Sequence, residues 1–523
     1  MTFTTSSRTC RRWSGSGRGS RGLIACAAIA GASVALIGQA IDPSQLLNPT
    51  KDSWPSYHGD YSGRRHSALT QITPDNVKQL GLAWVFQTGR TDQIKASPIV
   101  VNGVVYISTP DHVWALDARS GRQIWHYTHP ENQGFHIGHR GVAVYGDLVY
   151  LTTPDAYLIA LGAKDGKVRW KVTIADWKKG YWSTMAPLLI RNHLLVGVSG
   201  DFDNLPGLLQ SFDPSTGELQ WTFYTTKDGP HFGGQMWMTG TYDPELNLTY
   251  WGTGNPTPVL NGPARPGPNL YTNSIVALNP DTGKLAWHFQ ATPHDTHDWD
   301  ANEVPVLVDG TFRGQPTKML MHASRAGYFF VLDRATGKNL LTKPFGPVNW
   351  AKGIDEKGQP IPDPGKEPSR DGRLIAPNEA GLTNYRSPSV DAREGLFIVS
   401  AQDSYGIYFF KPEHGDYGWA GADYNIWGKG LLKAIDYQTG EIKWTKDLHG
   451  GAAGAGVLTT TTGVLFTGDS AGNVIALRTR DGSTLWHSGI GRVGSAPITY
   501  ELDGRQYLVI GGGQSLFAFA LPQ

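Results

Sequence analysis

Residues Ala277–Asp300 read ALNPDTGKLAWHFQATPHDTHDWD, and this stretch decides how the rest of the chain is interpreted. The first half, ALNPDTGKLAW, is one copy of a motif that recurs along the chain. The second half occurs once and places three aspartates and two histidines within the seven residues His294–Asp300. The repeated half predicts a scaffold, and the unique half predicts a reaction site built on that scaffold.

The repeated unit consists of an apolar strand, an Ala-Leu-Asp-like triplet, a turn that ends in Gly, and a Trp four residues after that Gly. It occurs in seven copies: Ala115–Trp125, Ala160–Trp170, Ser211–Trp221, Ala277–Trp287, Val331–Leu341, Ala434–Trp444 and Ala476–Trp486. The copy that ends at Leu341 has lost its Trp. Gly accepts a positive φ without steric cost, so each copy predicts a β-hairpin. A Trp at a fixed offset can then pack between adjacent sheets.

Spacings of roughly 40 to 50 residues are typical of four-stranded propeller blades. The longer gap between Leu341 and Ala434 contains the strand-like Gly395–Ala401 and is interpreted as a degenerate blade. Strand-like segments around Trp84 (GLAWVFQTG) and at the end of the chain (SLFAFAL) are expected to complete one closing sheet. The predicted fold is all-β: an eight-bladed β-propeller of four-stranded antiparallel blades with Gly-to-Trp docking motifs, a single domain over residues 41–523.

Composition narrows the partners and the location. Charged residues make up 17% of the 523 residues and the formal net charge is +1, so no nucleic-acid partner is expected. Residues 1–40 combine several arginines with the apolar run Leu23–Gly38 and are interpreted as a secretory signal peptide, with an uncleaved N-terminal anchor as the alternative. The expected location is periplasmic, with membrane contact only if this segment is uncleaved. Cys10 and Cys26 both lie in it, so the mature protein would carry no disulfide and no CxxCH haem attachment.

Two long polar insertions, 344–384 and 411–429, contain few apolar runs and many Gly and Pro. In a propeller such insertions lie over one face, so they are expected to form a lid over a central site.

Three stretches break the repeat with polar residues that a blade does not need: Gly252–Pro258 (GTGNPTP), Ser199–Asn204 (SGDFDN) and His294–Asp300. Taken singly, the first two read equally well as plain turns. Carboxylates at alternate positions, as at Asp298 and Asp300, repel one another unless a cation or solvent separates them. Hard cations such as Ca²⁺ take carboxylate and amide oxygens, which these stretches supply. Zinc is the less favoured alternative, because the histidines lack a clear third nitrogen ligand.

The Gly-to-Trp repeat, GTGNP, TPHDTHDWD and HASRAGYFFVLDR together resemble the eight-bladed quinoprotein alcohol dehydrogenases, which use pyrroloquinoline quinone (PQQ) and an alkaline-earth or lanthanide ion. The resemblance covers nearly the whole mature chain, from WPSYHGDYSGRRHSALTQI near Trp54 to the final FALP. It implies a periplasmic enzyme that oxidises an alcohol, polyol or sugar by hydride transfer to metal-bound PQQ. The electrons would pass to a separate cytochrome c or quinone acceptor.

The resemblance also implies roles for individual residues. Asp298 matches the catalytic carboxylate, a general base that also lies by the metal. Asn255 matches the metal-binding amide, and Asp300 matches the extra carboxylate of lanthanide-using members. The implied cofactor contacts are Trp237 as the indole beneath the quinone, Arg325 and Arg140 as cationic partners, and Thr184, Ser199 and Asn384 as polar contacts. Such partners suit a tricarboxylate quinone, which needs cations and hydroxyls around its rim and an aromatic face beneath it.

The sequence departs from the family at one metal ligand. The family's metal-binding Glu falls at Phe202, so this ligand cannot be carried over. Asp201, one residue earlier, is the favoured substitute, and Asp203 is the alternative.

Other departures indicate a divergent member. The family's adjacent cysteines are replaced by Gly134 and Phe135. Gly454 stands where methanol- and ethanol-oxidising members carry a Trp, which predicts a roomier pocket, and Lys95 stands where many carry an acidic residue. Two other functions stay open: a non-enzymatic scaffold of the outer-membrane assembly type, which shares the repeats, and an inactive family member.

Overall fold

The computed structural model describes residues 43–523 except 131–137, 201–202, 227–230 and 415–416. These residues belong to one compact unit, Ala40–Gln523. Its helices are short 3₁₀ turns: η1 (Pro43–Leu46), η2 (Val77–Gln79), η3 (Trp177–Lys179), η4 (Gly262–Ala264), η5 (Pro364–Lys366) and η6 (Pro412–His414). None of the helices in the described ranges is long and apolar enough to cross a bilayer.

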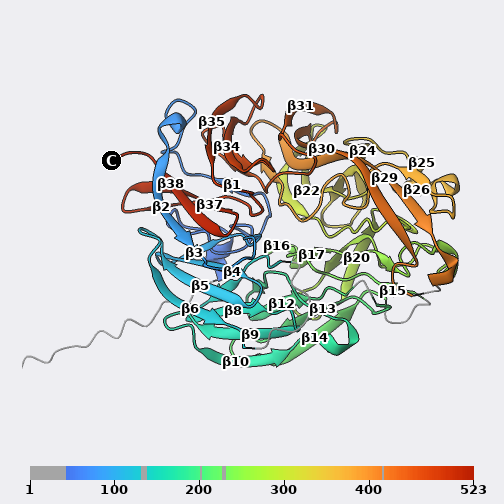
Figure 1. Cartoon of the computed structure of the whole chain (residues 1–523), viewed down its shortest axis with the longest axis horizontal. Coiled ribbons are helices and arrows are strands. Elements are labelled where there is room, and N and C mark those ends of the chain that lie inside the picture. Colours follow the sequence, from blue (N-terminus) through green and yellow to red (C-terminus); the bar gives the residue numbers. More distant parts are fainter. Residues whose placement is uncertain (1–42, 131–137, 201–202, 227–230, 415–416) are drawn as a thin grey trace, which may run out of the picture. The chain divides into compact units, whose positions relative to one another are not determined.

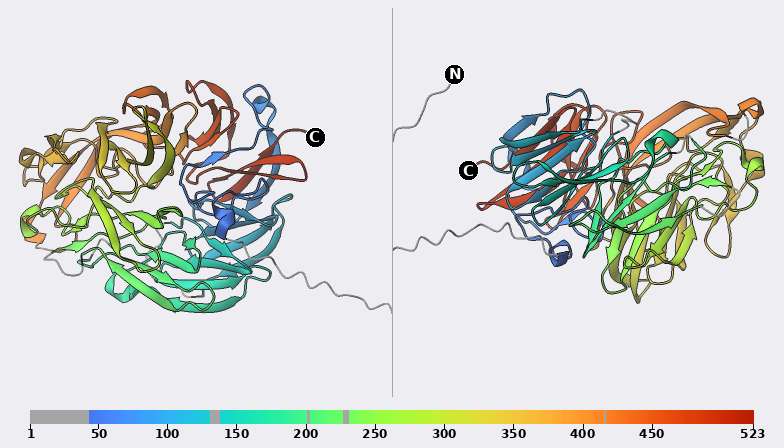
Figure 2. Two further views of the ribbon diagram at one scale, coloured as in Figure 1. Left: turned by 180° about the vertical axis from the view of Figure 1, so that it is seen from behind. Right: turned by 90° about the horizontal axis from the view of Figure 1, so that it is seen from below.

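Eight sheets, each built on four antiparallel strands, dominate the described residues, and they follow one another around a ring (Figures 1 and 2). The first sheet contains β3 (Ile99–Val101), β4 (Val104–Thr109), β5 (His112–Asp117) and β6 (Gln123–Thr128). The second contains β7 (Ala143–Tyr145), β8 (Leu148–Thr152), β9 (Tyr157–Gly162) and β10 (Val168–Thr173). The third contains β11 (Leu188–Ile190), β12 (His193–Gly197), β13 (Leu208–Phe212) and β14 (Leu219–Tyr224). The fourth contains β16 (Thr241–Asp243), β17 (Leu248–Gly252), β19 (Ser274–Leu278) and β20 (Leu285–Gln290).

The second half of the ring repeats this order. The fifth sheet contains β21 (Val306–Phe312), β22 (Gln315–Ala323), β23 (Tyr328–Asp333) and β24 (Asn339–Pro344). The sixth contains β28 (Ser389–Asp391), β29 (Leu396–Phe410), β30 (Gly421–Asp436) and β31 (Ile442–Asp447). The seventh contains β32 (Leu458–Thr460), β33 (Val464–Gly468), β34 (Asn473–Arg478) and β35 (Thr484–Gly489). The eighth contains β36 (Ile498–Leu502), β37 (Arg505–Gly512), β38 (Ser515–Ala520) and β2 (Gly81–Gln87). The predicted eight-bladed, all-β propeller is confirmed.

The eighth sheet closes the ring with strands from both ends of the described chain. Strand β2 pairs antiparallel with β38, from Gly81 opposite Ala520 to Gln87 opposite Ser515. The closing sheet predicted from Trp84 and the C-terminal SLFAFAL is therefore confirmed. The degenerate blade is confirmed as well, because Gly395–Ala401 falls at the start of β29 in the sixth sheet.

A Trp of one sheet packs on a Gly of the next sheet around the ring. A Cβ placed on Gly121 would lie 2.6 Å from the ring of Trp84, which closes the eighth sheet onto the first. The same contact recurs between Gly166 and Trp125, Gly217 and Trp170, Gly283 and Trp221, Gly337 and Trp287, and Gly482 and Trp444. These glycines have φ between 66° and 75°, a left-handed conformation that disfavours a Cβ. A side chain at these positions would also displace the indole. Gly is therefore required both by the backbone conformation and by the contact with the Trp ring.

The indole N–H of five of these six tryptophans donates to the neighbouring turn, and Trp170 Nε1 is the exception among the described residues. That of Trp84 donates to the carbonyl of Ala118 at 3.2 Å, and that of Trp221 donates to Pro280 at 2.8 Å. Each acceptor lies in the turn that carries the docking Gly. The Asp of the repeat shapes this turn: Asp117 Oδ1 accepts the backbone N–H groups of Arg119 and Ser120, both at 3.0 Å.

One joint in the ring lacks the Trp. Gly440 of the sixth sheet meets the side chains of Leu341 and Lys343, with Lys343 Cγ 2.6 Å from the position of an added Cβ. Aliphatic carbons therefore replace the indole at this joint, which explains how the copy ending in Leu341 still docks.

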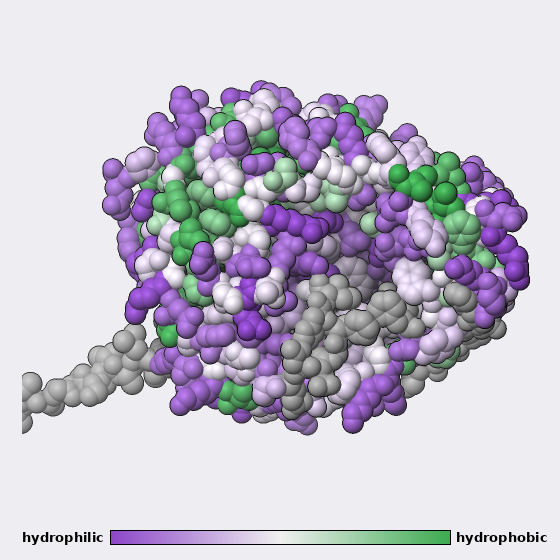
Figure 3. Space-filling model, viewed as in Figure 1, coloured by the Kyte–Doolittle hydropathy of each residue, from purple (hydrophilic) through white to green (hydrophobic). Residues whose placement is uncertain are grey.

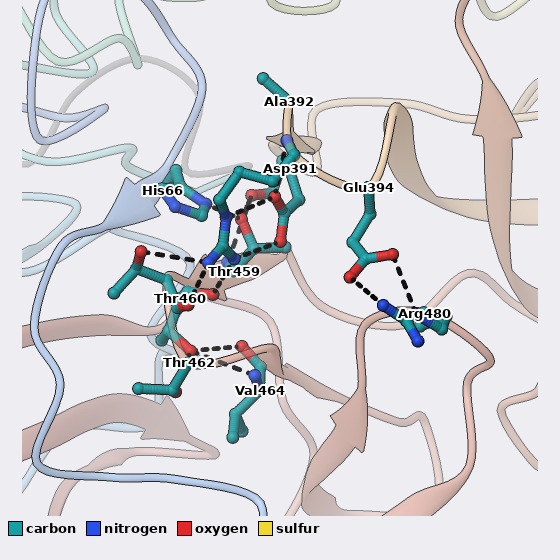
Figure 4. A network of polar contacts seen from close by, with 12 residues as sticks. His66, Asp391, Ala392, Glu394, Thr459, Thr460, Thr462, Val464 and Arg480 are labelled. Atoms are coloured by element: carbon teal, nitrogen blue, oxygen red, sulfur yellow. Dashed lines mark hydrogen bonds and ion pairs between the residues drawn. The ribbon is translucent and has the colours of Figure 1, made fainter.

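The segment before β2 joins two sheets of the ring. Strand β1 (His66–Ser67) pairs in parallel with β32, and His66 Nδ1 lies 2.8 Å from Thr459 Oγ1. Figure 4 shows this joint, where Asp391 of the sixth sheet lies beside His66 and Thr459. Arg393 donates to Asp391 Oδ2 at 2.8 Å and to the Thr460 carbonyl at 3.0 Å. Charged hydrogen bonds thus tie the sixth and seventh sheets at the N-terminal segment.

The two insertions contain strands of their own. Within 344–384, β25 (Ala351–Ile354) and β26 (Pro360–Pro362) form a hairpin, and β27 (Arg373–Ile375) pairs with β29. Residues 421–429 belong to β30, which pairs with β29 over its full length, so this part is a long hairpin and not a loop. Two further short strands, β15 (Phe232–Gly233) and β18 (Pro256–Thr257), pair with each other.

Replacing Gly283 by Ala tests the docking contact. A Cβ there would lie 2.5 Å from the Trp221 ring, so we expect both the left-handed backbone penalty and an overpacking penalty, together about 2–5 kcal/mol. Gly395→Ala is the matched control, because its φ is 69° and its Cβ would meet nothing within 4 Å. We expect only about 1–2 kcal/mol there. Urea unfolding of both variants measures the difference, and equal losses would contradict a role for the indole.

Candidate active site

The blade topology brings the predicted site residues to one end of the ring. In a meander of four antiparallel strands, the connection from the second to the third strand and the connection to the next sheet leave from the same end. Ser199, Asn255 and Arg325 follow the second strands β12, β17 and β22. Asp298 and Trp237 lie in connections to the next sheet. The docking turns lie at the opposite end, so the residues that dock the blades and the residues of the site occupy different loops.

A cavity of about 310 Å³ lies among these connections. Every predicted site residue that the structure describes lines it: Arg140, Thr184, Ser199, Trp237, Asn255, Asp298, Asp300, Arg325 and Asn384. Hydrophilic residues surround the hollow centre of the face shown in Figure 3. Asp201, the expected substitute for the family Glu, lies outside the described residues, as does Phe202.

One guanidinium holds the acidic end of the cavity together. Arg325 Nη2 donates to Asp298 Oδ2 at 2.8 Å, and Nη1 donates to Asp300 Oδ2 at 2.7 Å. Nη2 also lies 2.9 Å from Glu379 Oε1. The cation required between Asp298 and Asp300 is thus supplied here by Arg325. Asp298 has φ of 66°, a left-handed conformation that is held at a cost of about 1–2 kcal/mol and turns the chain sharply before Trp299.

Asp300 connects three elements of the site. Its Oδ1 accepts the Asn255 backbone N–H at 2.6 Å, and its Oδ2 accepts the Trp237 indole N–H at 3.0 Å. Burial raises the pKa of Asp300, although Arg325 opposes the shift. Burial lowers the pKa of Arg325, but the carboxylates of Asp298, Asp300 and Glu379 outweigh it and raise that pKa well above its ordinary value. The guanidinium therefore remains charged among an excess of acidic groups.

A buried acid–base pair, Glu303 and His322, lies behind Arg325. Burial raises the pKa of Glu303 well above its ordinary value and lowers the pKa of His322 to about 3. His322 Nε2 lies 3.7 Å from Glu303 Oε2. Burial therefore disfavours the charged form of both groups.

The remaining residues of the His294–Asp300 stretch shape the loop. Asp295 accepts the backbone N–H groups of His297 at 3.1 Å and Trp299 at 3.0 Å. His297 stacks on Trp299 at 4.3 Å between ring centroids, and His294 Nδ1 lies 2.8 Å from the Gly267 carbonyl. These three side chains therefore hold the loop in shape through hydrogen bonds and ring stacking.

The opposite end of the cavity is basic. The Arg140 guanidinium lies over the Trp237 ring at 4.9 Å from its centroid and 5.2 Å from that of Tyr385. Arg140 is only 6% exposed, and its Nε has no hydrogen-bond partner among the described residues. Burial lowers its pKa. No carboxylate of the described residues pairs with this buried guanidinium, and such an unpaired charge is costly, so this end suits an anionic ligand.

Several lining residues were not predicted as site residues. Glu379 and Trp419 come from the insertions, Tyr385 directly follows the first insertion, and Trp182 and Gln235 precede predicted residues on the same loops. Lys95, noted in the sequence only as a departure, lines the cavity too. Gly454 is not among the described residues that line it, and a Cβ there would lie 2.3 Å from the Gly468 carbonyl oxygen; the roomier pocket expected from Gly454 stays a prediction.

The residues present fit a tricarboxylate quinone and a hard cation. Arg140 offers an unused buried donor for a carboxylate, and Trp237 offers an aromatic surface. Asp298, Asp300 and Asn255 offer carboxylate and amide oxygens, the donors that alkaline-earth and lanthanide ions prefer. In the described residues no group of three or more His, Cys, Asp and Glu forms a metal site.

Comparison with known proteins identifies the family. A family model described as glucose/ethanol/alcohol dehydrogenase, beta-propeller domain, matches residues 54–366. The quinoprotein alcohol dehydrogenase PedH of Pseudomonas putida is 34% identical over 86% of this chain and 84% of its own length. The lanthanide-dependent methanol dehydrogenase of Methylacidiphilum fumariolicum is 32% identical over 94% and 88%. A solved quinohemoprotein alcohol dehydrogenase, ADHIIG from Pseudomonas putida, has a TM-score of 0.88 at 30% identity over 93% of this chain and 83% of that one.

A second model, for the outer membrane protein assembly factor BamB, matches residues 428–520. None of the described residues that line the cavity falls in this range, so the match covers scaffold alone. The chain belongs to the PQQ-dependent quinoprotein alcohol dehydrogenases, oxidoreductases that act on CH–OH groups.

Replacing Arg325 by Gln tests the carboxylate clamp. The variant leaves Asp298 and Asp300 buried without their cation, so we expect a loss of about 3–5 kcal/mol in the free energy of unfolding near neutral pH. The loss should shrink in acid, where the two carboxylates become protonated. Urea unfolding as a function of pH measures both effects.

Arg64→Gln is the matched control. Its ion pair with Asp60 spans 3.4 Å and is 43% exposed on the arginine side, so we expect about 1 kcal/mol or less. A loss at Arg325 no larger than that at Arg64 would show that the clamp does not stabilise the fold.

Proposed function

We propose that this protein is a periplasmic dehydrogenase that oxidises an alcohol with PQQ and either Ca²⁺ or a lanthanide ion. The observation that carries the proposal is the charge separation inside one cavity: Arg140 at one end, and Asp298 and Asp300 on a single guanidinium at the other. A ligand with carboxylates on one side and a metal-bound carbonyl on the other complements both ends. The relatives named above support the cofactor class and, through the methanol dehydrogenase, a lanthanide.

The residues of the chain would hold the cofactor in distinct ways. Arg140 would bind a carboxylate, and Thr184, Ser199 and Asn384 would contribute polar groups at the rim. The Trp237 indole would support the ring, and its own N–H is already fixed on Asp300. Asn255, Asp298 and Asp300 would supply oxygens to the cation, and Asp201 is proposed as a further ligand.

When bound, PQQ supplies a hydride acceptor and the cation polarises its carbonyl. We assign Asp298 as the general base that takes the proton of the alcohol hydroxyl. Its carboxylate lines the cavity, and Arg325 fixes its orientation through Oδ2. A positioned base of this kind contributes about 10²- to 10⁴-fold to a rate.

The electrons would leave through a separate cytochrome c or quinone, because the sequence contains no CxxCH haem attachment. The periplasmic location is proposed on the arginine-rich apolar segment within residues 1–40, with an uncleaved anchor as the alternative.

Reconstitution of the mature protein with PQQ and Ca²⁺ or La³⁺, followed by dye reduction with a panel of alcohols, tests the proposal. Asp298→Asn should bind PQQ as the parent protein does and lose about 10²- to 10⁴-fold in kcat. Asp75→Asn, an exposed carboxylate outside the cavity, should retain turnover. If neither ion supports PQQ binding, the scaffold or inactive-member interpretation replaces this one. Full turnover in Asp298→Asn would remove that residue from the role of base.

Replacing Asp300 by Ala tests the choice of metal. A trivalent ion gains more than a divalent one from an added carboxylate, so we expect the activation constant for La³⁺ to rise about tenfold more than that for Ca²⁺. Asp300→Asn removes the charge but keeps an oxygen that can accept the Trp237 indole N–H. Comparing it with Asp300→Ala distinguishes the effect of the charge from the effect of the hydrogen bond. Equal effects on the two ions would contradict the lanthanide assignment.

A further inference from the structure

Four cations gather around Tyr385 at the basic end of the cavity. Lys95 Nζ lies 5.9 Å from the centroid of the phenol ring, the Arg140 guanidinium 5.2 Å and the Arg386 guanidinium 4.7 Å. Arg492 adds its charge to the same group. Lys95, Arg140 and Tyr385 line the cavity directly, so this cluster faces the space where a ligand would bind.

The charges of this cluster reinforce one another. Burial alone would raise the pKa of Tyr385, yet Arg386, Lys95, Arg140 and Arg492 together lower it. Burial lowers the pKa of Lys95, and the neighbouring arginines lower it further, although Tyr385 opposes them. Cations held this close destabilise one another unless an anion joins them. The basic end therefore favours binding of more negative charge than Arg140 alone could pair with.

The cluster is held in place by its surroundings. Arg386 Nε donates to the Gly454 carbonyl, and the backbone N–H of Arg140 donates to the Thr184 carbonyl at 2.9 Å. A Cβ placed on Gly138 would lie 2.7 Å from Cδ of Lys95, so this glycine leaves room for the lysine stem. A pre-positioned set of donors costs little conformational entropy when a ligand binds.

We propose that Lys95, Tyr385 and Arg386 form a second carboxylate-binding subsite beside Arg140. The inference rests on the proposed function for the identity of the ligands. The carboxylate has two sources in such an enzyme: the tricarboxylate cofactor, or a hydroxy-acid substrate. Lys95 supplies the ammonium that pairs with the carboxylate, the Tyr385 hydroxyl donates a hydrogen bond to it, and Arg386 adds positive charge behind the phenol.

Calorimetric titration of the metal-loaded apoprotein with PQQ tests the cofactor source. Lys95→Gln and Arg386→Gln should each weaken PQQ binding, with Lys95→Gln losing roughly 10- to 100-fold. Tyr385→Phe removes only the hydroxyl and should lose less. Lys78→Gln and Arg122→Gln, exposed residues outside the cavity, are the matched controls and should bind PQQ as the parent protein does.

Steady-state kinetics of the PQQ-loaded enzyme test the substrate source. If Lys95→Gln raises KM for a 2-hydroxycarboxylate and leaves KM for the neutral alcohol of equal length unchanged, the subsite binds the substrate. If PQQ affinity falls and the ratio of the two KM values stays constant, the subsite binds the cofactor. If Lys95→Gln changes neither the PQQ affinity nor that ratio, the proposal is overturned.

A probe that does not depend on the proposed function distinguishes failure of the subsite proposal from failure of the proposed function. Benzene-1,3,5-tricarboxylate should bind the apoprotein and bind Lys95→Gln more weakly. If the parent protein does not bind PQQ, the proposed function fails. Binding of this probe then tests, without PQQ, whether the subsite binds carboxylates. Equal or absent binding of the probe in both proteins would overturn the subsite, whereas weaker binding in Lys95→Gln would support it.

Discussion

The contact of an indole with a glycine of the next blade is the constraint on which the rest of the structure depends. The Trp on the outer strand requires a neighbour without a Cβ, and the turn that presents this neighbour requires a positive φ. One residue type satisfies both demands. In five of the six contacts the indole N–H also donates to that turn, so these contacts fix both the separation and the orientation of two sheets. Repetition around the ring lets Trp84 close the eighth sheet onto the first.

This docking leaves the other end of each blade free to vary. The hairpin turns that carry the glycines use one end, and the connections between second and third strands and between blades use the other. Polar residues can therefore converge from many blades without disturbing the joints. Arg325 shows the benefit: it follows β22 in the fifth sheet, yet it reaches carboxylates from the preceding connection and Glu379 from an insertion.

The sequence predicted features that repeat or that match a family motif in order. The repeat period predicted the blades, the closing sheet and the missing Trp at Leu341. Each copy of the repeat contains both the docking Gly and the position of the docking Trp, so a departure is visible in the sequence. The resemblance placed Asp298, Arg325 and Arg140 in one cavity. Glu379 and Trp419 lie in the insertions and Tyr385 follows the first of them. These residues escaped prediction because this part of the chain has no period, and their approach to the cavity depends on packing between distant segments. The long β29–β30 hairpin also escaped, because its strand residues alternate with Gly and polar side chains.

Electrostatics explains why this cavity is incomplete by itself. At one end Asp298, Asp300 and Glu379 contact a single guanidinium, so three carboxyl groups share one cation, and burial raises the pKa of Asp300 despite that cation. At the other end Arg140 is buried beside further cations, and the lowered pKa of Tyr385 reports an excess of positive charge. Moving either cluster to the surface would stabilise the free protein. The fold instead holds the acidic and the basic cluster at opposite ends of one cavity. An anionic ligand at the basic end and a cation at the acidic end would neutralise both clusters.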